Sequence, residues 1–388
     1  MSEHSLLGAS GANRWMKCPG SASLSRGVAK EESDYLAAEG TVAHTVAKDC
    51  LEKGMEAWEW AGDRINGFDV TSEMVNAVQV YLDYASANTL PGVNSRWVEY
   101  KFNCPDLHPA FYGTVDLGSY SGEASRDLLV ADYKHGAGIV VEVQENPQLM
   151  YYACGLIHEN NLWDKVDNIT LCIVQPRAYH SDGPIRHWSI SAPQLKAWLY
   201  ETLIPAMEKA FSSDETNSGD HCRFCPMVGR ACPQIVKDMD ELQEMLSMVS
   251  IVGAGELTNE QVSRILDLLD LANIVGKKVK EAAFARLNAG HEIPGRKLAA
   301  AKSNRAWKEG AEPELVKEFG MTAYNTSLKS PAQIEALPRG EGVASRWAFK
   351  PDTGLTMVKA DDSRTGVDRN VKSMFQDTTK KGRISKDG

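Results

Sequence analysis

The sequence lacks any long run of apolar residues. No run approaches the roughly 20 residues that a membrane-spanning helix needs, and the first ten residues show neither the basic stretch nor the apolar stretch of a secretory signal. Basic residues are also in deficit, because 42 Lys and Arg face 52 Asp and Glu and leave a net charge of −10. We therefore expect a cytoplasmic protein with no membrane partner and no general basic coat for nucleic acid, although a local basic groove beside an acidic metal site is compatible with this charge.

The chain also lacks a Walker A phosphate-binding loop, so ATP-driven helicase action is not supported. In other respects its composition is typical of globular proteins, with 43% hydrophobic and 24% charged residues. A length of 388 residues allows two or three domains. We expect a first domain over residues 1–250, a helical and mixed C-terminal domain over 251–376, and a flexible tail over 377–388.

The first domain mixes helical and strand-like periodicity. Helical patterns cover residues 35–53, 71–88, 147–159 and 193–212, and strand patterns cover 96–102, 111–119, 128–134 and 169–175. The turn-forming segment 121–126 predicts that the second and third strands form a hairpin. This mixture indicates an α/β core, a central mixed sheet flanked by helices. Further on, residues 257–288 show the spacing of a long helix that packs in a helical hairpin.

The most informative signal is a pair of acidic motifs on the two strands of that hairpin. The first is Gly113-Thr-Val-Asp116 and the second is Asp132-Tyr-Lys134. Asp132 and Lys134 are two residues apart, so they point to the same face of the strand, and Asp116 on the neighbouring strand can meet them. Two carboxylates and a lysine on one face suit a hard cation and a phosphate substrate.

Four further polar residues accompany these motifs. His44 closes the segment Gly40-Thr-Val-Ala-His44, and Glu99 lies on the strand before the hairpin. Gln148 and Tyr152 are four apart and share one helix face. Each residue by itself is more typical of core packing or of a solvated surface. Their order along helix, strand, strand, strand and helix is what argues for a common site.

This ordered set resembles the RecB-type nucleases of the PD-(D/E)XK superfamily, over roughly residues 36–155. The resemblance implies a restriction-endonuclease-like fold. It implies that His44, Asp116 and Asp132 hold a catalytic Mg²⁺ or Mn²⁺, and that Lys134 assists catalysis. The second acid is Asp132 rather than Glu, which the family pattern permits.

The same resemblance implies that Gln148 and Tyr152 orient the site and touch DNA, while Glu99 receives no firm role from it. The expected activity is that of a metal-dependent DNA exonuclease in phage recombination, repair or replication. A phage single-strand-binding or annealing protein is a candidate partner. Two other interpretations stay open: a DNA-binding module that keeps the nuclease fold without activity, and a regulatory protein that carries zinc or a metal cluster.

Eight cysteines in a cytoplasmic chain argue against a disulfide framework. Three are clustered, as Cys222-Arg-Phe-Cys225 followed by Cys232, in a loop-like segment. This spacing predicts a metal site that needs a fourth ligand, for which Cys18 is the best candidate and His221 a local alternative that favours zinc. The spacing does not decide between zinc and iron–sulfur. The remaining cysteines are expected in the core: Cys50, Cys104, Cys154 and Cys172.

Some RecB-type nucleases, including the AddB nuclease domain and CRISPR-associated exonucleases, have one cysteine before the nuclease motifs and three after them. In those proteins the four cysteines bind a 4Fe-4S cluster. The resemblance implies the same role here for Cys18, Cys222, Cys225 and Cys232, with the cluster closing a loop of about 200 residues. The segment Ser10-Gly-Ala-Asn-Arg-Trp-Met-Lys-Cys18-Pro-Gly-Ser-Ala is similar to the start of a phage and prophage family of such nucleases.

The C-terminal region contains one segment with nucleic-acid character. Basic residues alternate there with a tryptophan, in the order Arg296, Lys297, Lys302, Arg305 and Trp307. Such a segment can follow a phosphate backbone while the indole stacks on a base. It is equally typical of a solvated basic strand.

Overall fold

The computed structural model describes residues 6–28, 35–88, 95–123, 125–301, 306–308, 310–324, 330–335, 339–349, 354–359 and 365–367. The chain forms two compact units, Met1–Val275 and Gly276–Gly388. Their boundary lies inside helix α9 (Asn259–Asn288), further along than the expected boundary at residue 250. The reason is that Leu271 and Ile274 of α9 pack with the cysteine segment of the first unit. The expected tail lies outside the described residues.

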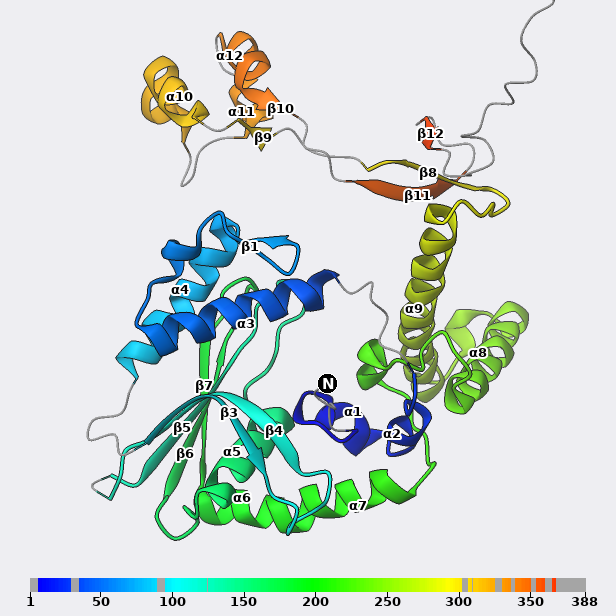
Figure 1. The fold of residues 1–388 in the computed structure, drawn as a ribbon. Helices are drawn as coiled ribbons and strands as arrows, with labels where there is room; N and C mark the ends of the chain where they lie inside the picture. Colours follow the sequence, from blue (N-terminus) through cyan, green and yellow to red (C-terminus); the bar gives the residue numbers. More distant parts are fainter. Residues whose placement is uncertain are drawn as a thin grey trace, which may run out of the picture. The chain divides into compact units, whose positions relative to one another are not determined.

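A five-stranded mixed sheet forms the centre of the first unit (Figure 1). The strand order is β3-β4-β5-β6-β7, in which β5 and β6 are parallel and all other neighbours antiparallel. The strands are β3 (Ser95–Asn103), β4 (Tyr112–Tyr120), β5 (Asp127–Tyr133), β6 (Asn168–Val174) and β7 (Ile185–Ser191). The expected fold class, a central mixed sheet flanked by helices, is confirmed. Strand β7 was not predicted, because it is a half-exposed edge strand of mixed polarity.

Helices cover both faces of this sheet. On one face α3 (Tyr35–Lys53) and α4 (Ser72–Ala87) bury Val46 and Met74 in one apolar cluster with Leu129 and Tyr133 of β5. The opposite face is covered by α5, whose Leu149 and Leu156 pack in a second cluster with other strand residues. The α-helices that share this second cluster are α1 (Ala12–Lys17), α2 (Gly20–Leu24), α5 (Pro147–Glu159), α6 (Ala192–Trp198) and α7 (Ile204–Ser212).

Local sequence explains where the helices begin. The Thr71 hydroxyl accepts a hydrogen bond from the Met74 amide at the start of α4, and Asn146 caps α5 just before Pro147. The helix expected over 193–212 is observed with an irregularity. A π-helical stretch, Leu199–Leu203, joins α6 to α7. Pro205, two residues after this stretch, has no amide hydrogen for the regular helical bond, which accounts for the widened turn.

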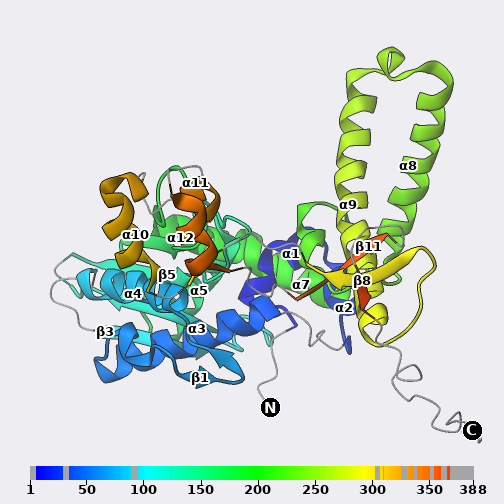
Figure 2. The ribbon, with the colours of Figure 1, turned by 90° about the horizontal axis from the view of Figure 1, so that it is seen from above.

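Helices α8 (Pro233–Val252) and α9 lie side by side as a hairpin (Figure 2). Leu242 of α8 packs with Ile265 and Leu268 of α9, and Arg264 donates hydrogen bonds to Glu241. The expected helical hairpin is thus confirmed. The first unit also contains the short strands β1 (Arg64–Ile65) and β2 (Phe68–Asp69).

The second unit combines small sheets with short helices. A three-stranded antiparallel sheet has the order β11-β8-β12, and β9 pairs with β10 in a separate ladder. Leu315, Ile334 and Val343 form its helical core. The elements after α9 are β8 (Arg296–Ala300), β9 (Ala306–Trp307), α10 (Ala311–Phe319), α11 (Pro331–Glu335), α12 (Gly340–Trp347), β10 (Ala348–Phe349), β11 (Leu355–Lys359) and β12 (Gly366–Val367).

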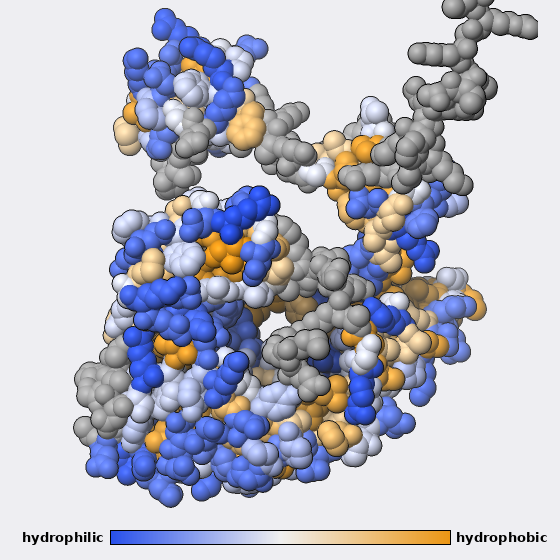
Figure 3. Space-filling view, in the orientation of Figure 1, coloured by the Kyte–Doolittle hydropathy of each residue, from blue (hydrophilic) through white to orange (hydrophobic). Residues whose placement is uncertain are grey.

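Hydrophilic residues cover most of the face drawn in Figure 3, with apolar residues in separate patches, one of them over α8. Among the described helices, none combines the length and the apolar character needed to cross a membrane.

Candidate metal and phosphate site

Asp116 lies where β4 changes the face that its side chains present. Val115 packs in the cluster with α5, whereas Leu117 packs in the cluster with α3 and α4, although a regular strand would place both on one face. The β3–β4 ladder is interrupted at the same level. It pairs Val98 with Leu117 and Tyr100 with Val115 but skips the pair between them, Glu99 and Asp116.

Glu99 has a backbone φ of +44°, in the left-handed region. A non-glycine residue there costs on the order of 1–3 kcal/mol and persists only where its surroundings enforce it. The two acidic residues therefore face each other at a distorted point of an otherwise regular ladder. Strain of this kind clusters at functional sites.

His44 of α3 completes a group of three metal-ligand types. Its Nδ1 lies 3.6 Å from Glu99 Oε1 and 3.6 Å from Asp116 Oδ2. One ligand atom from each of the three residues lies within 4.8 Å of the others. In the part of the chain that the structure describes, no other three His, Cys, Asp or Glu residues come this close. Two carboxylates and an imidazole form a donor set suited to Mg²⁺ or Mn²⁺.

The charges of His44, Glu99 and Asp116 shift the pKa values within this group. Burial raises the pKa of Asp116 to about 7, against the influence of nearby His44 and with the help of Asp132 and Glu99. Burial by itself lowers the pKa of His44, but the negative charges of Asp116, Glu99 and Asp132 outweigh it and raise that pKa to about 9. Near neutral pH the group therefore retains protons that a bound cation would replace.

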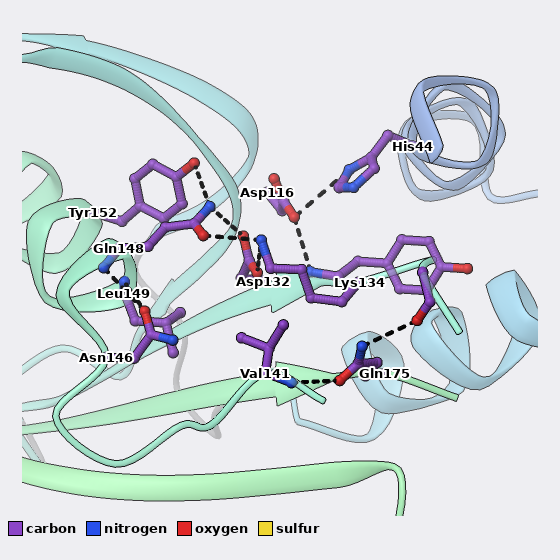
Figure 4. A network of polar contacts seen from close by, with 12 residues as sticks. His44, Asp116, Asp132, Lys134, Val141, Asn146, Gln148, Leu149, Tyr152 and Gln175 are labelled. Atoms are coloured by element: carbon purple, nitrogen blue, oxygen red, sulfur yellow. Dashed lines mark hydrogen bonds and ion pairs between the residues drawn. The ribbon is translucent and has the colours of Figure 1, made fainter. Parts of the chain in front are cut away.

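A second polar cluster lies on the α5 side of β5 (Figure 4). Lys134 Nζ lies 2.7 Å from Asp132 Oδ2 and donates a hydrogen bond to Gln148 Oε1 at 3.0 Å. Gln148 Nε2 in turn lies 3.1 Å from both Asp132 Oδ1 and the Tyr152 hydroxyl oxygen, and donates to both. Asp132 Oδ2 is buried and makes an ion pair with Lys134. A carboxylate oxygen has two lone pairs, so this one can also bind a cation.

The two clusters are joined through the strands. The amide of Tyr133 donates to Asp116 Oδ2 at 2.9 Å. Continuing the β4–β5 register by one residue beyond the Leu117–Ala131 pair places Asp116 opposite Asp132. Three carboxylates, one imidazole and one lysine thus converge from β3, β4, β5 and α3.

The comparison with protein-family models gives a match over residues 4–365, to a family described as a protein of unknown function, DUF2800. The chain belongs to this DUF2800 family. The match includes the whole of the site and all of the clustered cysteines.

In this DUF2800 chain the structure brings together every residue of the expected nuclease motifs. His44 and Asp116 form one group, and Asp132, Lys134, Gln148 and Tyr152 form the adjoining one. Glu99, which the sequence left without a firm role, joins His44 and Asp116, whereas Asp132 pairs with Lys134. The only sequence signal for Glu99 was an acidic residue between two apolar neighbours in a strand.

Sequence reasoning missed a network beside the site. The Tyr133 hydroxyl is 2.8 Å from His135 Nδ1, and His135 Nε2 is 2.6 Å from Arg177 Nη1. Arg177 also donates to Glu39 of α3 and Glu73 of α4. Burial, aided by the charge of Arg177, lowers the pKa of His135 to about 4. The network ties the sheet to the helix that carries His44.

The cysteines of the DUF2800 chain are all buried and free of disulfides. Cys222, Cys225 and Cys232 share one apolar cluster. The Asn217 amide lies 3.4 Å from Cys18 Sγ and its side chain donates to the Lys17 carbonyl, so Cys18 lies beside the segment that leads into this cluster. His221 Nε2 instead lies 2.9 Å from the Asn217 carbonyl oxygen.

The described cysteine sulfurs include no three within 4.8 Å of one another. Four thiolates on one zinc ion, each about 2.3 Å from the metal, would lie closer than this. Four cysteines are a donor set that both zinc and a 4Fe-4S cluster accept.

The basic C-terminal segment is divided between two sheets. Arg296 and Lys297 begin β8, whereas Trp307 belongs to β9 and packs against the helical core of the second unit. Lys302 and Arg305 lie outside the described residues. Packing accounts for Trp307, so its stacking on a base stays a prediction.

Proposed function

We propose that this protein is a metal-dependent DNA exonuclease of the RecB type that acts in phage DNA recombination, repair or replication. The observation that carries the proposal is the convergence of His44, Glu99 and Asp116 beside the Lys134–Asp132 pair. A scaffold without activity has no need for buried like charges, which cost free energy unless something compensates them. Without metal, protons on His44 and Asp116 supply this compensation, and a bound cation would take their place.

Different residues of the site would bind the metal and stabilise the phosphate. His44, Glu99 and Asp116 would hold Mg²⁺ or Mn²⁺, with Asp132 Oδ2 as a further ligand. An ion bound there would supply Lewis-acid chemistry, polarising the phosphate and activating water. Lys134, fixed by Gln148, places a positive charge where the phosphate gains negative charge. Gln148 and Tyr152 keep Lys134 and Asp132 in register with α5.

We further propose that Cys18, Cys222, Cys225 and Cys232 hold a 4Fe-4S cluster with a structural role. The support is the burial of all four thiols and the proximity of Cys18 to the segment before Cys222. Such a cluster would join the two ends of the nuclease unit.

The experiment is hydrolysis of end-labelled linear and circular DNA by anaerobically purified protein, with Mg²⁺, Mn²⁺ or EDTA, beside Asp132→Ala. We expect shortening of linear DNA alone, abolished by EDTA and by the substitution. Nicking of circles would identify an endonuclease. DNA binding without cleavage, in protein with its metals in place, would favour the inactive DNA-binding module.

A further inference from the structure

An exposed apolar loop begins two residues after Lys134. Residues 136–141, here named the apolar loop, connect β5 towards α5 and contain Ile139 and Val140, which are 38% and 36% exposed. Gly136 and Gly138 in the same loop give the free chain unusual freedom. A loop of this composition would be ordered only if something outside it fixed its position.

Gln175, at the end of β6, fixes this loop. Its side chain is 1% exposed and forms three hydrogen bonds with the loop, of which Figure 4 shows the one with Val141. Oε1 accepts from the Val141 amide at 3.0 Å, and Nε2 donates to the carbonyls of Gly136 at 3.0 Å and Ile139 at 2.8 Å. Buried Arg186 of β7 adds hydrogen bonds to the Val141 carbonyl and to Gln175 Oε1. The sheet thus fixes the backbone of the loop that carries the two aliphatic side chains.

A neighbouring loop adds an exposed aromatic ring. Tyr179, between β6 and β7, is 91% exposed. Arg186 joins this loop to the apolar loop, because it donates to the Gly183 carbonyl as well as to Val141. His180 Nε2 also lies 3.6 Å from Glu142 Oε2, just past the apolar loop. The loop that carries the aliphatic side chains and the loop that carries the phenol ring are therefore joined to each other, and the first of them begins two residues after Lys134.

Rigid aliphatic side chains part stacked bases when proteins insert them between base steps, and exposed aromatic rings stack on freed bases. We propose that Ile139 and Val140 form a wedge that opens the terminal base pair of duplex DNA, and that Tyr179 stacks on the released base. The substrate is then a duplex end, one strand of which passes to Lys134. This inference rests on the proposed nuclease function and adds its substrate class.

Strand opening can be measured apart from cleavage. A blunt duplex with 2-aminopurine at its terminal pair is mixed with the full-length protein in Ca²⁺ and, separately, in EDTA. Fluorescence rises when the base unstacks. We expect a rise with wild-type protein and none with the Ile139→Ser/Val140→Ser double variant. The matched control is Ile251→Ser/Val252→Ser on α8, a more exposed Ile-Val pair at 83% and 47% exposure, which should open the duplex normally.

Hydrolysis supplies the second readout. With Mg²⁺ or Mn²⁺, the double variant should lose about tenfold or more on blunt duplex, because unstacking costs a few kcal/mol per step, and should keep its rate on single strands. Equal loss on both substrates would overturn the wedge, as would wild-type protein that does not raise the fluorescence, or a double variant that does. If the protein opens the duplex but does not hydrolyse DNA, the wedge proposal stands and the nuclease proposal fails. If it hydrolyses DNA but does not open the duplex, the nuclease proposal stands and the wedge proposal fails. A binding surface for an apolar protein partner would then be the better explanation of Ile139 and Val140.

Discussion

Glu99 carries backbone strain at the point where its carboxylate meets those of its neighbours. Its φ of +44° interrupts the β3–β4 ladder opposite Asp116 and directs an acidic side chain towards His44. A glycine would adopt this backbone without strain. The strained backbone at Glu99 therefore lowers the stability of the fold while it positions a carboxylate that could bind a metal. Both effects can be measured.

Replacing Glu99 by glycine should separate the strain from the charge. In metal-free protein, the free energy of unfolding of Glu99→Gly should be about 1 kcal/mol higher than that of Glu99→Gln. The reason is that glycine adopts the left-handed backbone conformation without strain, whereas glutamine does not. Both variants should bind Mn²⁺ more weakly than wild type. Denaturant unfolding and Mn²⁺ titration provide the two values. A glycine variant no more stable than the glutamine variant would show that the backbone at Glu99 is unstrained.

His44 and Asp116 set the pH dependence of metal binding. Both pKa values are raised in the folded protein, from 6.5 to about 9 for His44 and from 3.8 to about 7 for Asp116. The stability that protonated His44 contributes is fully present below pH 6.5 and is lost as the pH rises to about 9. The stability that protonated Asp116 contributes is fully present below pH 3.8 and is lost as the pH rises to about 7. The folded metal-free protein thus holds extra protons throughout this range and loses stability as the pH rises.

A cation displaces those protons, so Mn²⁺ affinity should rise with pH up to about 9 and binding should release protons. Calorimetric titrations in buffers of different ionisation enthalpy measure both quantities. In His44→Ala the part of this rise that comes from His44 should be lost, and Asp116 alone should set the remaining rise. An affinity that does not depend on pH in wild-type protein would mean that the ion binds elsewhere.

Lys134 is expected to act on turnover rather than on binding. Lys134→Gln should lower the rate of hydrolysis by on the order of 100-fold, since it removes a positive charge aimed at the phosphate, and should leave DNA affinity nearly unchanged. Exposed Lys165 is the matched control, and Lys165→Gln should leave the rate unchanged. Single-turnover rates and fluorescence anisotropy distinguish the two effects. Equal losses in rate and affinity would make Lys134 a binding residue.

At the scale of single residues, the sequence predicted which side chains lie close together, but not the backbone geometry and hydrogen bonds that place them. The order of His44, Asp116, Asp132 and Lys134 sufficed to predict one cluster. The role of Glu99 depends on a left-handed backbone that no periodicity signals, and the network around Gln175 depends on strand pairing between distant segments.

Helix α5 is placed against the sheet by a glycine. A Cβ on Gly155 would lie 2.1 Å from the Phe102 ring, which is itself buried, so α5 can approach β3 only with glycine at this position. The same helix holds Gln148 and Tyr152 in the site. The close packing of Gly155 on Phe102 therefore helps to position Gln148 and Tyr152 in the candidate site.

Gly155→Ala should destabilise the protein by about 1–3 kcal/mol, the usual cost of overpacking a core, and should also slow hydrolysis. Gly40→Ala in α3 is the matched control. A Cβ there meets nothing within 4 Å, so that alanine should be neutral or should stabilise by up to about 1 kcal/mol. Thermal and denaturant unfolding measure both changes. Similar results for the two variants would mean that α5 can shift freely on the sheet.

Elements with strong local signals were predicted closely. The expected helix over 147–159 is α5, Pro147–Glu159, because Asn146 and Pro147 mark its start, and the strand expected over 128–134 is β5, Asp127–Tyr133. Elements governed by their surroundings were not. Strand β7 exists through its pairing with β6, and the π-helical turn before Pro205 follows from one missing amide hydrogen.

At the scale of the whole molecule, the two ends of the first unit meet at the cysteines. Periodicity predicted the central sheet and the helical hairpin, but it placed the domain boundary at 250 because it could not show that Leu271 of α9 packs with the cysteine segment. Contacts between residues far apart in sequence decide such boundaries. The proposed cluster would reinforce the same closure.

Replacing Cys18 should remove the proposed link between the two ends of the first unit. Cys18→Ala, purified without oxygen, should lose the iron and sulfide of the cluster and unfold at lower denaturant concentration, because closing a loop of about 200 residues contributes several kcal/mol in principle. Cys50→Ala, a buried cysteine outside the cluster, should keep its iron. Iron and sulfide analysis and visible absorbance are the measurements. Bound zinc in place of iron, or no metal in the wild-type protein, would contradict the cluster.

The most direct test of the central claim is to locate the cation. Crystals grown with Mn²⁺ and measured at the manganese absorption edge should give an anomalous peak within bonding distance of His44, Glu99 and Asp116, and Asp116→Ala crystals should lose it. A wild-type map without a peak at these residues, from protein that hydrolyses DNA in Mn²⁺, would contradict the proposed metal site.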